Sequence, residues 1–473
     1  MKTTSGKGRR FALTTAILLA SIAARGSDAA ETIRLISDAN LSTRAETRIE
    51  TMGELKLLVT LDAEDGGKSR QKTTAVPVTV SAQLRYDDRP LGTPTTNTTT
   101  NTLRRAIRRY EIAAAKMQVG KGTIESTLSE VRKTIVVTET NEGAELFSPA
   151  GPLDRSELEL LTAQVDSGLL NLLLPGKVID VGSRWEPNQT VLARLLRLDV
   201  INQTDVALTL VGVEKKVALL EITGKVSGGV EGVVSDLELS GKLNFNLEQQ
   251  CCTWAAMELK EARAASAGTP GFNTTSRIRV AIAPTETPPE LTDDAIADYK
   301  TTPDEATRLL RFASEKQNFE LVYEPKWRVV SDSEDMAVLR LIERGDLIAQ
   351  CNASRLKPLG AGEQLTLEGF QADLKRSLGK TFHEFVEAGE SLGENGLRVL
   401  RVVISANVSE VPIHYVFYHL SDDHQNRLSL ALTMDAEMAE RFGRSEETLV
   451  NSLQFTTVPT KTQARAKDGK LKK

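Results

Sequence analysis

The feature that most constrains the fold is a long stretch in which apolar and polar residues alternate one by one. Between Ile201 and Ala264, apolar side chains recur at every second position in successive short runs. The runs are Val206-Leu208-Leu210, Ala218-Leu220-Ile222, Leu237-Leu239 and Leu243-Phe245-Leu247. Glycines lie between them at hairpin-like intervals, for example Gly228-Gly229 and Gly232. This alternation with short turns predicts an antiparallel meander that has one apolar and one polar face.

A similar pattern precedes this stretch, and one helix interrupts it. Residues 32–150 are mostly strand-like. Asp154 can cap a helix, and Glu157 completes a capping box with it. An apolar stripe then continues until Pro175-Gly176 ends it. The pattern predicts a core-facing helix near 154–173, laid on the sheet.

The length of 473 residues predicts two or three domains, each large enough to bury its own core. The segment from Ile282 to Asp294 is rich in Pro, Thr and acidic residues and offers little to bury, which is typical of a linker. The predicted divisions are a signal peptide (1–29), a β-rich antiparallel domain (30–281), a linker (282–301), a second domain (302–458) and a disordered basic tail (459–473).

The second domain combines helical and strand patterns. Thr302-Pro303-Asp304-Glu305 has an N-cap, a proline at the first helical position and a capping-box glutamate, so we expect a helix there. Thr366 caps another helix that ends at Gly379, and short helical stretches near 438–442 and 446–453 close the domain. We therefore predict an α+β protein: an N-terminal antiparallel β-meander with one packed helix, and a C-terminal α-β-α sandwich with an antiparallel sheet.

The first 29 residues have the organisation of a secretory signal peptide. Basic residues are followed by a 14-residue apolar stretch from Phe11 to Ala24, and Ser27-Asp28-Ala29 offers small residues for cleavage. A stretch of 14 residues is too short to span a bilayer, which takes about 20. The sequence predicts export to the periplasm or the extracellular space, with no transmembrane segment after cleavage. The Arg9-Arg10 pair leaves the twin-arginine route open beside the general one.

Cysteine usage gives no disulfide framework. The three residues, Cys251, Cys252 and Cys351, are too few and odd in number. Cys351 lies on the apolar face of a strand-like pattern, and we interpret all three as buried structural thiols. A strained Cys251-Cys252 bond, or a bridge from either to Cys351, stays open. The pair has no nearby His or second CxxC, so no metal site is predicted.

Composition excludes several classes of binding protein. Aromatic residues make up only 4%, which leaves little for stacking on sugars or single-stranded bases. The net charge of −5 gives no general positive field for nucleic acid. The local cluster of Arg104, Arg105, Arg108 and Arg109 could bind a phosphate or a polyanion, but we interpret it as the solvated edge of a helix or strand. No cofactor and no nucleic-acid partner are predicted.

Three motifs that could carry chemistry lack the surroundings that this chemistry needs. Ser391 stands in a GxSxG motif, but a hairpin signal and a strand follow it in place of the helix of a nucleophile elbow. Arg344-Gly345-Asp346 spells an adhesion tripeptide, which we interpret as hairpin-turn chemistry. His414 and His419 would face opposite sides of one strand and cannot share a metal. We predict no catalytic, cofactor-binding or metal residues, and structural or surface roles for all histidines, including His383 and His424.

Four segments in the last third of the chain carry a family resemblance. They are FELVYEPKW (Phe319 to Trp327), FQADLKRSL (Phe370 to Leu378), HYVFYHL (His414 to Leu420) and SEETLVNSLQF (Ser445 to Phe455). With the order of elements around them, they resemble the PsbP-like and DcrB-like α-β-α sandwich. The resemblance implies an extracytoplasmic, non-enzymatic domain that docks on protein complexes, with no active-site residues to carry over. The N-terminal part, with Leu172 to Pro187, is similar to uncharacterised secreted bacterial proteins and, in architecture, to lipoprotein-carrier folds.

Together these features predict an exported, non-enzymatic binding or interaction protein of the bacterial envelope. We expect its partner to be an envelope protein or an apolar ligand. One alternative is a carrier that holds a lipid-like ligand in a concavity of the N-terminal sheet, which requires that the protein's own side chains leave the concavity open. The other alternative is a serine hydrolase that uses Ser391, and undiminished esterase turnover in Ser391→Ala would remove it.

Overall fold

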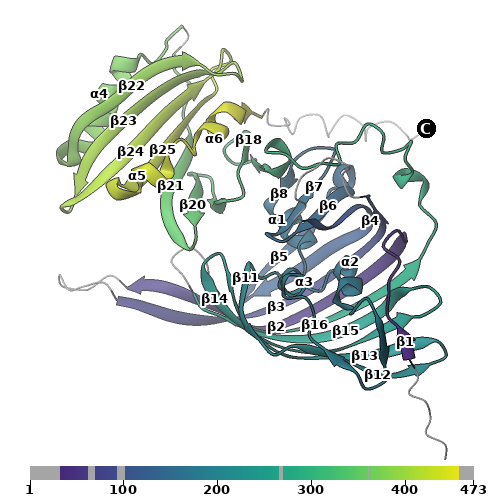
Figure 1. Ribbon diagram of the computed structural model, residues 1–473. Coiled ribbons are helices and arrows are strands. Elements are labelled where there is room, and N and C mark those ends of the chain that lie inside the picture. Colours follow the sequence, from purple (N-terminus) through teal and green to yellow (C-terminus); the bar gives the residue numbers. More distant parts are fainter. Residues whose placement is uncertain (1–31, 62–69, 93–101, 266–269, 361, 457–473) are drawn as a thin grey trace, which may run out of the picture.

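The chain folds into two large antiparallel sheets that a small sheet joins (Figure 1). The structure is a computed structural model, and it describes residues 32–61, 70–92, 102–265, 270–360 and 362–456. The predicted signal peptide (1–29) and basic tail (459–473) lie outside the described residues. Within the part of the chain that is described, no helix is both long and apolar enough to cross a membrane.

The first described sheet has 13 strands and follows the chain in two meanders. Strands β12 to β16 are sequential neighbours, and β16 then pairs with β2, which leads through β3 and β4 to β6 and β7. The strands are β2 (Thr43–Leu61), β3 (Arg70–Pro90), β4 (Thr102–Val119), β5 (Gly122–Thr127), β6 (Thr134–Thr140), β7 (Ala144–Phe147), β10 (Arg184–Trp185), β11 (Val200–Thr204), β12 (Ala207–Glu214), β13 (Val217–Val230), β14 (Val233–Asn246), β15 (Cys251–Arg263) and β16 (Gly271–Pro284). Strands β1 (Thr32–Arg34) and β9 (Val178–Asp180) form a separate pair.

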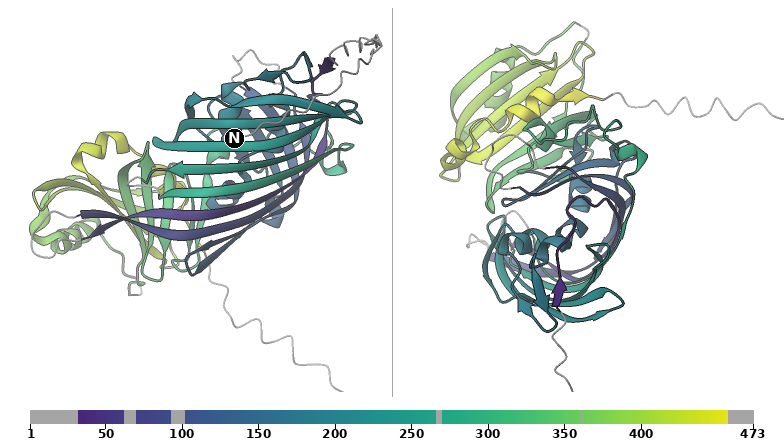
Figure 2. Two further views of the ribbon diagram at one scale, coloured as in Figure 1. Left: turned by 90° about the horizontal axis from the view of Figure 1, so that it is seen from below. Right: turned by 45° about the vertical axis from the view of Figure 1, so that its right-hand side comes forward.

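This sheet curves around three short helices (Figure 2). They lie on its concave side and are α1 (Arg155–Leu161), α2 (Ser167–Leu170) and α3 (Gln189–Leu196). Along β14, side chains from Val233 to Phe245 alternate between buried and more exposed, as the sequence pattern predicted. From Leu237 to Phe245, the buried apolar side chains belong to one core cluster with leucines of the helices, among them Leu161, Leu170 and Leu196.

The single helix predicted near 154–173 is divided in the structure. The backbone N–H of Asp154 donates to Glu157 Oε2 over 2.9 Å, which confirms the capping box at the start of α1. Val165, with φ at +59°, interrupts the helical path between α1 and α2. Helix α3 was not predicted from the sequence. Its N-cap is Asn188, whose side chain accepts two backbone hydrogen bonds.

The second large described sheet has seven strands in the order β19-β20-β21-β25-β24-β23-β22. They are β19 (Trp327–Asp332), β20 (Ala337–Glu343), β21 (Asp346–Arg355), β22 (Phe382–Leu392), β23 (Arg398–Val408), β24 (Val411–Ser421) and β25 (Arg427–Asp435). Helix α4 (Leu367–Leu378) packs on β22 and β23, where Phe370 contacts a cluster with Leu400 and Val402. The short helices α5 (Ala439–Phe442) and α6 (Glu447–Ser452) contribute to the larger core cluster.

The predicted α+β class, with its C-terminal α-β-α sandwich, is wrong, because the protein is mostly β, with 57% strand and 15% helix. The helix expected from Thr302 is only one turn of 3-10 helix, Ala306–Arg308. Asp304 and Thr307 close this turn, since the backbone N–H of each donates to the side chain of the other. The apolar residues that follow then enter a strand, β17 (Leu310–Ser314), in place of a helix.

A small four-stranded sheet joins the two halves of the chain. Its order is β26-β18-β17-β8, with β26 at Gln454–Phe455, β18 at Phe319–Tyr323 and β8 at Leu153–Asp154. Strand β8 belongs to the first half and pairs in parallel with β17, so that Leu153 lies opposite Leu310. Nearby, the guanidinium of Arg155 donates to the carbonyl oxygen of Trp327 over 3.0 Å. Backbone pairing as well as chain connectivity therefore holds the two large sheets together.

The segment predicted as a linker (282–301) lies against the first sheet. Leu291 is fully buried and Ile296 is nearly so, and both pack in a cluster with Ile107 and Val136. By strand alternation this cluster lies on the face of the sheet opposite to the helices. The composition of the segment predicted little burial, whereas these two apolar side chains anchor it.

A buried ionic cluster ties the concave face to the helices. Arg108 is 1% exposed, and its two terminal nitrogens each donate to Asp166 over 2.7 Å while Nε donates to Asp88 over 2.7 Å. Arg104 also pairs with Asp88. Burial alone would raise the pKa of Asp166, but Arg108 and the neighbouring arginines hold it well below its usual range. The interpretation of this arginine cluster as a solvated edge is therefore wrong for Arg104 and Arg108.

We expect Arg108→Met to lower the free energy of unfolding by about 3–5 kcal/mol, because it leaves two carboxylates buried without their shared cation. Urea unfolding followed by circular dichroism measures this loss. Arg109→Met is the matched control, since Arg109 is the neighbouring arginine and is less buried. Equal losses in the two variants would contradict a special role for Arg108.

The cysteines form no disulfide among the described residues. Cys251, Cys252 and Cys351 are all buried and free, which confirms their interpretation as buried thiols. Burial raises the pKa of Cys251 to about 11 and the pKa of Cys351 to about 12. Burial also raises the pKa of Cys252.

We expect the cysteines of the native protein not to react with a water-soluble maleimide at neutral pH. The reagent cannot reach the buried sulfur atoms, and their raised pKa values keep them protonated. After unfolding in guanidinium chloride, all three cysteines should react. Intact mass spectrometry counts the adducts in both states. An adduct that forms rapidly on the native protein would show that at least one thiol is not held as the fold implies.

Candidate functional site

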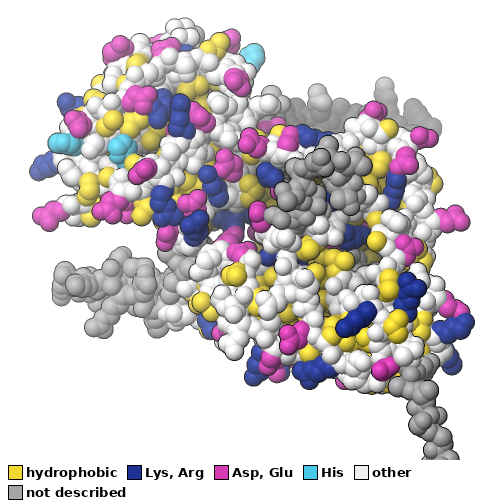
Figure 3. Space-filling model, in the orientation of Figure 1, with side chains coloured by type: hydrophobic (Ala, Val, Ile, Leu, Met, Phe, Trp, Pro, Cys, Tyr) yellow, Lys and Arg dark blue, Asp and Glu magenta, His cyan; other side chains and the backbone are white. Residues whose placement is uncertain are grey.

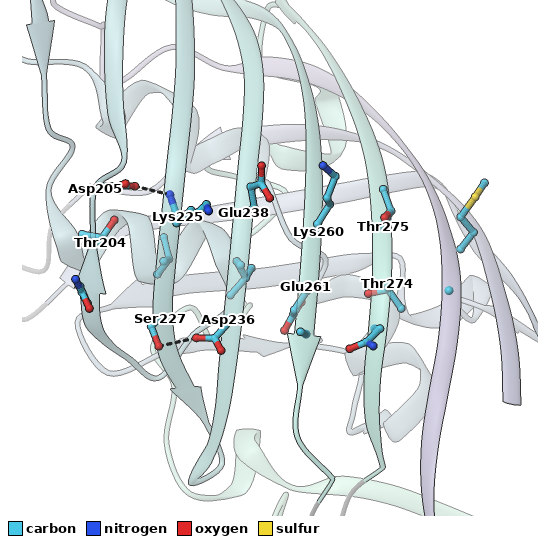
Figure 4. A pocket seen from close by; sticks show the side chains of 17 residues that line it. Thr204, Asp205, Lys225, Ser227, Asp236, Glu238, Lys260, Glu261, Thr274 and Thr275 are labelled. Atoms are coloured by element: carbon cyan, nitrogen blue, oxygen red, sulfur yellow. Dashed lines mark hydrogen bonds between the residues drawn. The ribbon is translucent and has the colours of Figure 1, made fainter. Parts of the chain in front are cut away.

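An open groove of about 680 Å³ crosses the outer face of the 13-stranded sheet (Figure 4). It runs across β13, β14, β15 and β16 and ends at β2 on one side and β11 on the other. We call it the outer groove. Its lining residues are Met52, Gly53, Gln203, Thr204, Asp205, Lys225, Val226, Ser227, Asp236, Leu237, Glu238, Lys260, Glu261, Ala262, Asn273, Thr274 and Thr275.

Strand register places the polar lining in two rows. In the first row, Lys225 lies opposite Glu238, which lies opposite Lys260, and Lys260 lies opposite Thr275. The second row runs from Ser227 through Asp236 to Ala262 and Asn273. On β14 the neighbours of these residues, such as Leu239, are buried against the helices, so the two rows point away from the helices.

Glycine shapes one end of the outer groove. A Cβ at Gly53 would lie 2.1 Å from the carbonyl oxygen of Asn273 and 2.7 Å from Thr274 Cα. No residue with a side chain fits such an approach without a shift of β2 or β16. Gly53 therefore lets the two strands come close where the groove ends.

Most charged side chains of the outer groove form no ion pair with the other described residues. Ser227 Oγ donates to Asp236 Oδ1 over 2.7 Å, and Asp205 Oδ1 accepts from the backbone N–H of Lys225 over 2.5 Å. Within the described residues, neither Lys225 nor Lys260 forms an ion pair. Two ammonium groups and the carboxylates of Asp205, Asp236 and Glu238 thus face solvent together. Such a surface suits a polar partner that carries both signs of charge.

The concave face offers much less room. Helices α1 to α3 occupy it, and their leucines join the core of the sheet. The remaining space is a cavity of about 240 Å³ beside α1, lined by Ile49, Val80, Ala115 and Leu160 among others. Pockets that enclose drug-sized ligands usually measure about 300–1,000 Å³. The concavity that the carrier alternative needs is therefore largely filled by the protein itself.

Ser391 lies in an exposed part of β22, at the edge of the seven-stranded sheet. It pairs with Val399 of β23, and a turn follows where a nucleophile elbow would have a helix. Asp422 and His424 lie in another turn, where Asp422 Oδ1 accepts from the backbone N–H of His424 over 2.9 Å. The structure does not bring Ser391 into hydrogen-bond contact with a histidine among the described residues.

The Arg344-Gly345-Asp346 tripeptide forms the turn between β20 and β21, as the sequence predicted. Arg344 and Gly345 both have positive φ, at +54° and +85°. The turn packs against the β13–β14 hairpin, where a Cβ at Gly232 would lie 2.7 Å from the carbonyl oxygen of Arg344. Asp346 pairs with Arg441 over 2.9 Å. The tripeptide is therefore engaged within the protein.

The histidines form no metal site in the part of the chain that the structure describes. No group of three or more His, Cys, Asp or Glu side chains is arranged there to hold an ion. His414 and His419 face opposite sides of β24, as predicted. His419 is buried and lines a second cavity at the end of the sheet, and no motif in the sequence marks it as different from the other histidines.

The sequence pattern also did not predict the residues of the outer groove as a functional site. Lys225, Glu238 and Lys260 are the ordinary outward-facing positions of an alternating strand. Only the strand register, which brings them opposite one another, makes them a set. A sequence alone does not contain that register.

Comparisons with known proteins found solved structures that are similar over part of this chain. No protein-family model matches the sequence, and no curated protein matches it either. Cyanobacterial PsbP (CyanoP) from Synechocystis sp. PCC 6803 is similar over 31% of this chain and 92% of its own, with 15% identity and a TM-score of 0.25. The Ran-binding protein Mog1p from Saccharomyces cerevisiae is similar over 31% of this chain and 95% of its own, with 9% identity and a TM-score of 0.25.

A protein from Bacteroides thetaiotaomicron VPI-5482 is similar over 31% of this chain and 48% of its own, with 11% identity and a TM-score of 0.23. Each of these three similarities covers 31% of this chain, and none supports the N-terminal resemblance to secreted bacterial proteins. At such TM-scores they carry no argument about function.

Proposed function

We propose that the chain is an exported, non-enzymatic interaction protein of the bacterial envelope and that the outer groove is where its partner binds. The observation that supports this most is that Lys225 and Lys260 of the groove form no ion pair with any of the residues that the structure describes. They stand on β13 and β15, which both pair with β14 between them, so their spacing is held without help from a ligand.

The chemistry of the groove favours a protein partner over a nucleic acid or a lipid. Positive and negative side chains alternate along the row Lys225, Glu238 and Lys260, so a polyanion would meet carboxylates beside each ammonium. On the face of the molecule seen in Figure 3, Lys and Arg are likewise interspersed with Asp and Glu. Met52, 56% exposed, is the large apolar side chain of the lining that offers a hydrophobic anchor. We infer a polar, salt-sensitive contact with a protein surface of complementary charge pattern.

Neither alternative has comparable support. The carrier would need an open concave face, and helices α1 to α3 fill most of it. The hydrolase would need a base beside Ser391, which lies on an exposed edge strand. The interaction function therefore remains the one that the geometry supports best.

Photo-cross-linking in the producing cells tests the proposal. We expect a benzoylphenylalanine placed at Thr275, inside the groove, to form a discrete protein adduct. The same probe at Ala256 is the matched control. Ala256 lies on β15 and on the same face of the sheet as Lys260, but outside the groove. In the Thr275 background, the pair Lys225→Glu and Lys260→Glu should reduce the adduct about tenfold, because two attractive contacts become repulsive.

A second control separates the groove from general surface charge. Lys242→Glu alters an exposed lysine of β14 that pairs with Glu221 over 3.6 Å outside the groove, and it should leave the adduct unchanged. Equal adduct yields from Thr275 and Ala256, or an adduct insensitive to the double reversal, would overturn the assignment of the outer groove.

A further inference from the structure

A second cavity, of about 210 Å³, lies at one end of the seven-stranded sheet. Its walls come from the start of β23, the end of β24, the start of β25 and the segment that leads into α4. Arg398, His419 and Arg427 line it, and we call it the Arg–His cavity. It shares no lining residue with the outer groove.

One wall of this cavity contains a buried histidine. His419 is 1% exposed, and Arg427 Nε donates to its Nε2 over 2.9 Å. A guanidinium can only donate, so Nε2 is unprotonated and the neutral ring carries its proton on Nδ1. Burial, together with the charges of Arg427 and Arg398, lowers the pKa of His419 to about 4, which keeps the ring neutral at neutral pH. Among the described residues Nδ1 has no hydrogen-bond partner.

A buried donor without an acceptor is unusual, and leaving one unsatisfied costs about 1–3 kcal/mol. Phe370 of α4 lies over the same ring, with 6.0 Å between the ring centroids. The ring is therefore held between β24 and α4.

The two arginines have donors to spare. Arg427 donates to the carbonyl oxygen of Lys357 over 2.8 Å and forms no ion pair among the described residues. Burial lowers the pKa of Arg427, as expected for a partly covered cation without an acidic partner. Arg398 pairs with Glu390 through Nε over 2.7 Å and donates Nη1 to the carbonyl oxygen of Leu365 over 2.7 Å. Its Nη2 has no partner in the described part of the chain.

A helix end adds to this positive environment. Leu365, which lines the cavity, stands just before α4, a helix of 12 residues. Thr366 caps α4 by accepting from the backbone N–H of Gly369 over 3.0 Å. The positive end of the helix dipole therefore lies beside the arginines and favours an anion at the same place.

Acidic side chains at the rim set a limit on the charge of that anion. Glu363 and Asp423 line the cavity and are exposed, and Asp422 is half-buried. Asp422 accepts three hydrogen bonds within its own turn, from His424 and Asn426. A ligand with a single negative charge therefore meets less repulsion from these carboxylates than a multiply charged one.

We propose that the Arg–His cavity binds the carboxylate group of a small organic molecule, which accepts hydrogen bonds from the guanidinium groups of Arg398 and Arg427 beside the ring of His419. This site is independent of the interaction function proposed for the outer groove. The volume limits the ligand to the size of a short organic acid or an amino acid.

Histidine-selective NMR of the full chain tests this. The protein has four histidines, so its imidazole signals are few, and His419→Asn identifies the one of interest. Titration with acetate should shift the His419 signal in a saturable way and leave those of His383, His414 and His424 in place. Arg427→Gln should weaken the apparent affinity about tenfold or more, because a charge-assisted hydrogen bond is lost.

The matched control is Arg340→Gln, on β20 of the same sheet, since Arg340 donates to Gln350 and does not line the cavity. Each variant is first compared with the parent by circular dichroism and thermal melting, and acetate should raise the melting temperature of the parent but not of Arg427→Gln. Inorganic phosphate should bind more weakly than acetate. A His419 signal unmoved by acetate in the folded parent, an equal response in Arg427→Gln, or tighter binding of phosphate would overturn the proposal.

Discussion

Arg108 joins the 13-stranded sheet to the helices inside it, and most of the first half of the molecule is arranged around that contact. Its guanidinium bridges Asp88 on β3 and Asp166, which also caps α2 by accepting from the N–H of Gly168. The ring of Tyr86 lies under the same guanidinium, 4.7 Å away. One cation thus fixes where a helix starts and which strands it covers. The filled concave face, from which the proposal of binding at the outer face follows, depends on this contact.

The sequence was most informative where one period governs many residues. The alternation along β14 sorted buried from exposed side chains correctly, and Asp154 with Glu157 located the start of α1. It was misleading where the burial of a side chain depends on partners that are distant in the sequence. Arg108 is polar by type, and the carboxylates that allow its burial lie 20 and 58 residues away in the chain. The expected helix after Thr302 failed for a related reason, since strand pairing with β8 outweighed a good local start.

Neither candidate site could be predicted, because each is produced by register and not by composition. The row Lys225, Glu238 and Lys260 is unremarkable in the chain and becomes a set only when three strands pair. The same holds for His419, whose missing acceptor is visible only once Arg427 occupies its other nitrogen. In both sites the informative property is what a side chain lacks after folding. Local sequence reports what a residue is, and it does not report which of its bonding groups remain free.

The small sheet has a consequence for the order in which the chain can fold. Strand β8 meets β17 across more than 150 residues, and β18 is completed by β26 at Gln454–Phe455, close to the end of the described chain. Closing such long loops is slow, because their entropy is lost before the contacts form. Until the last residues are available, β18 presents an open strand edge. The joint between the two halves is therefore completed last, and a chain that ends before Gln454 would keep the strands of both large sheets but leave this edge of β18 unpaired.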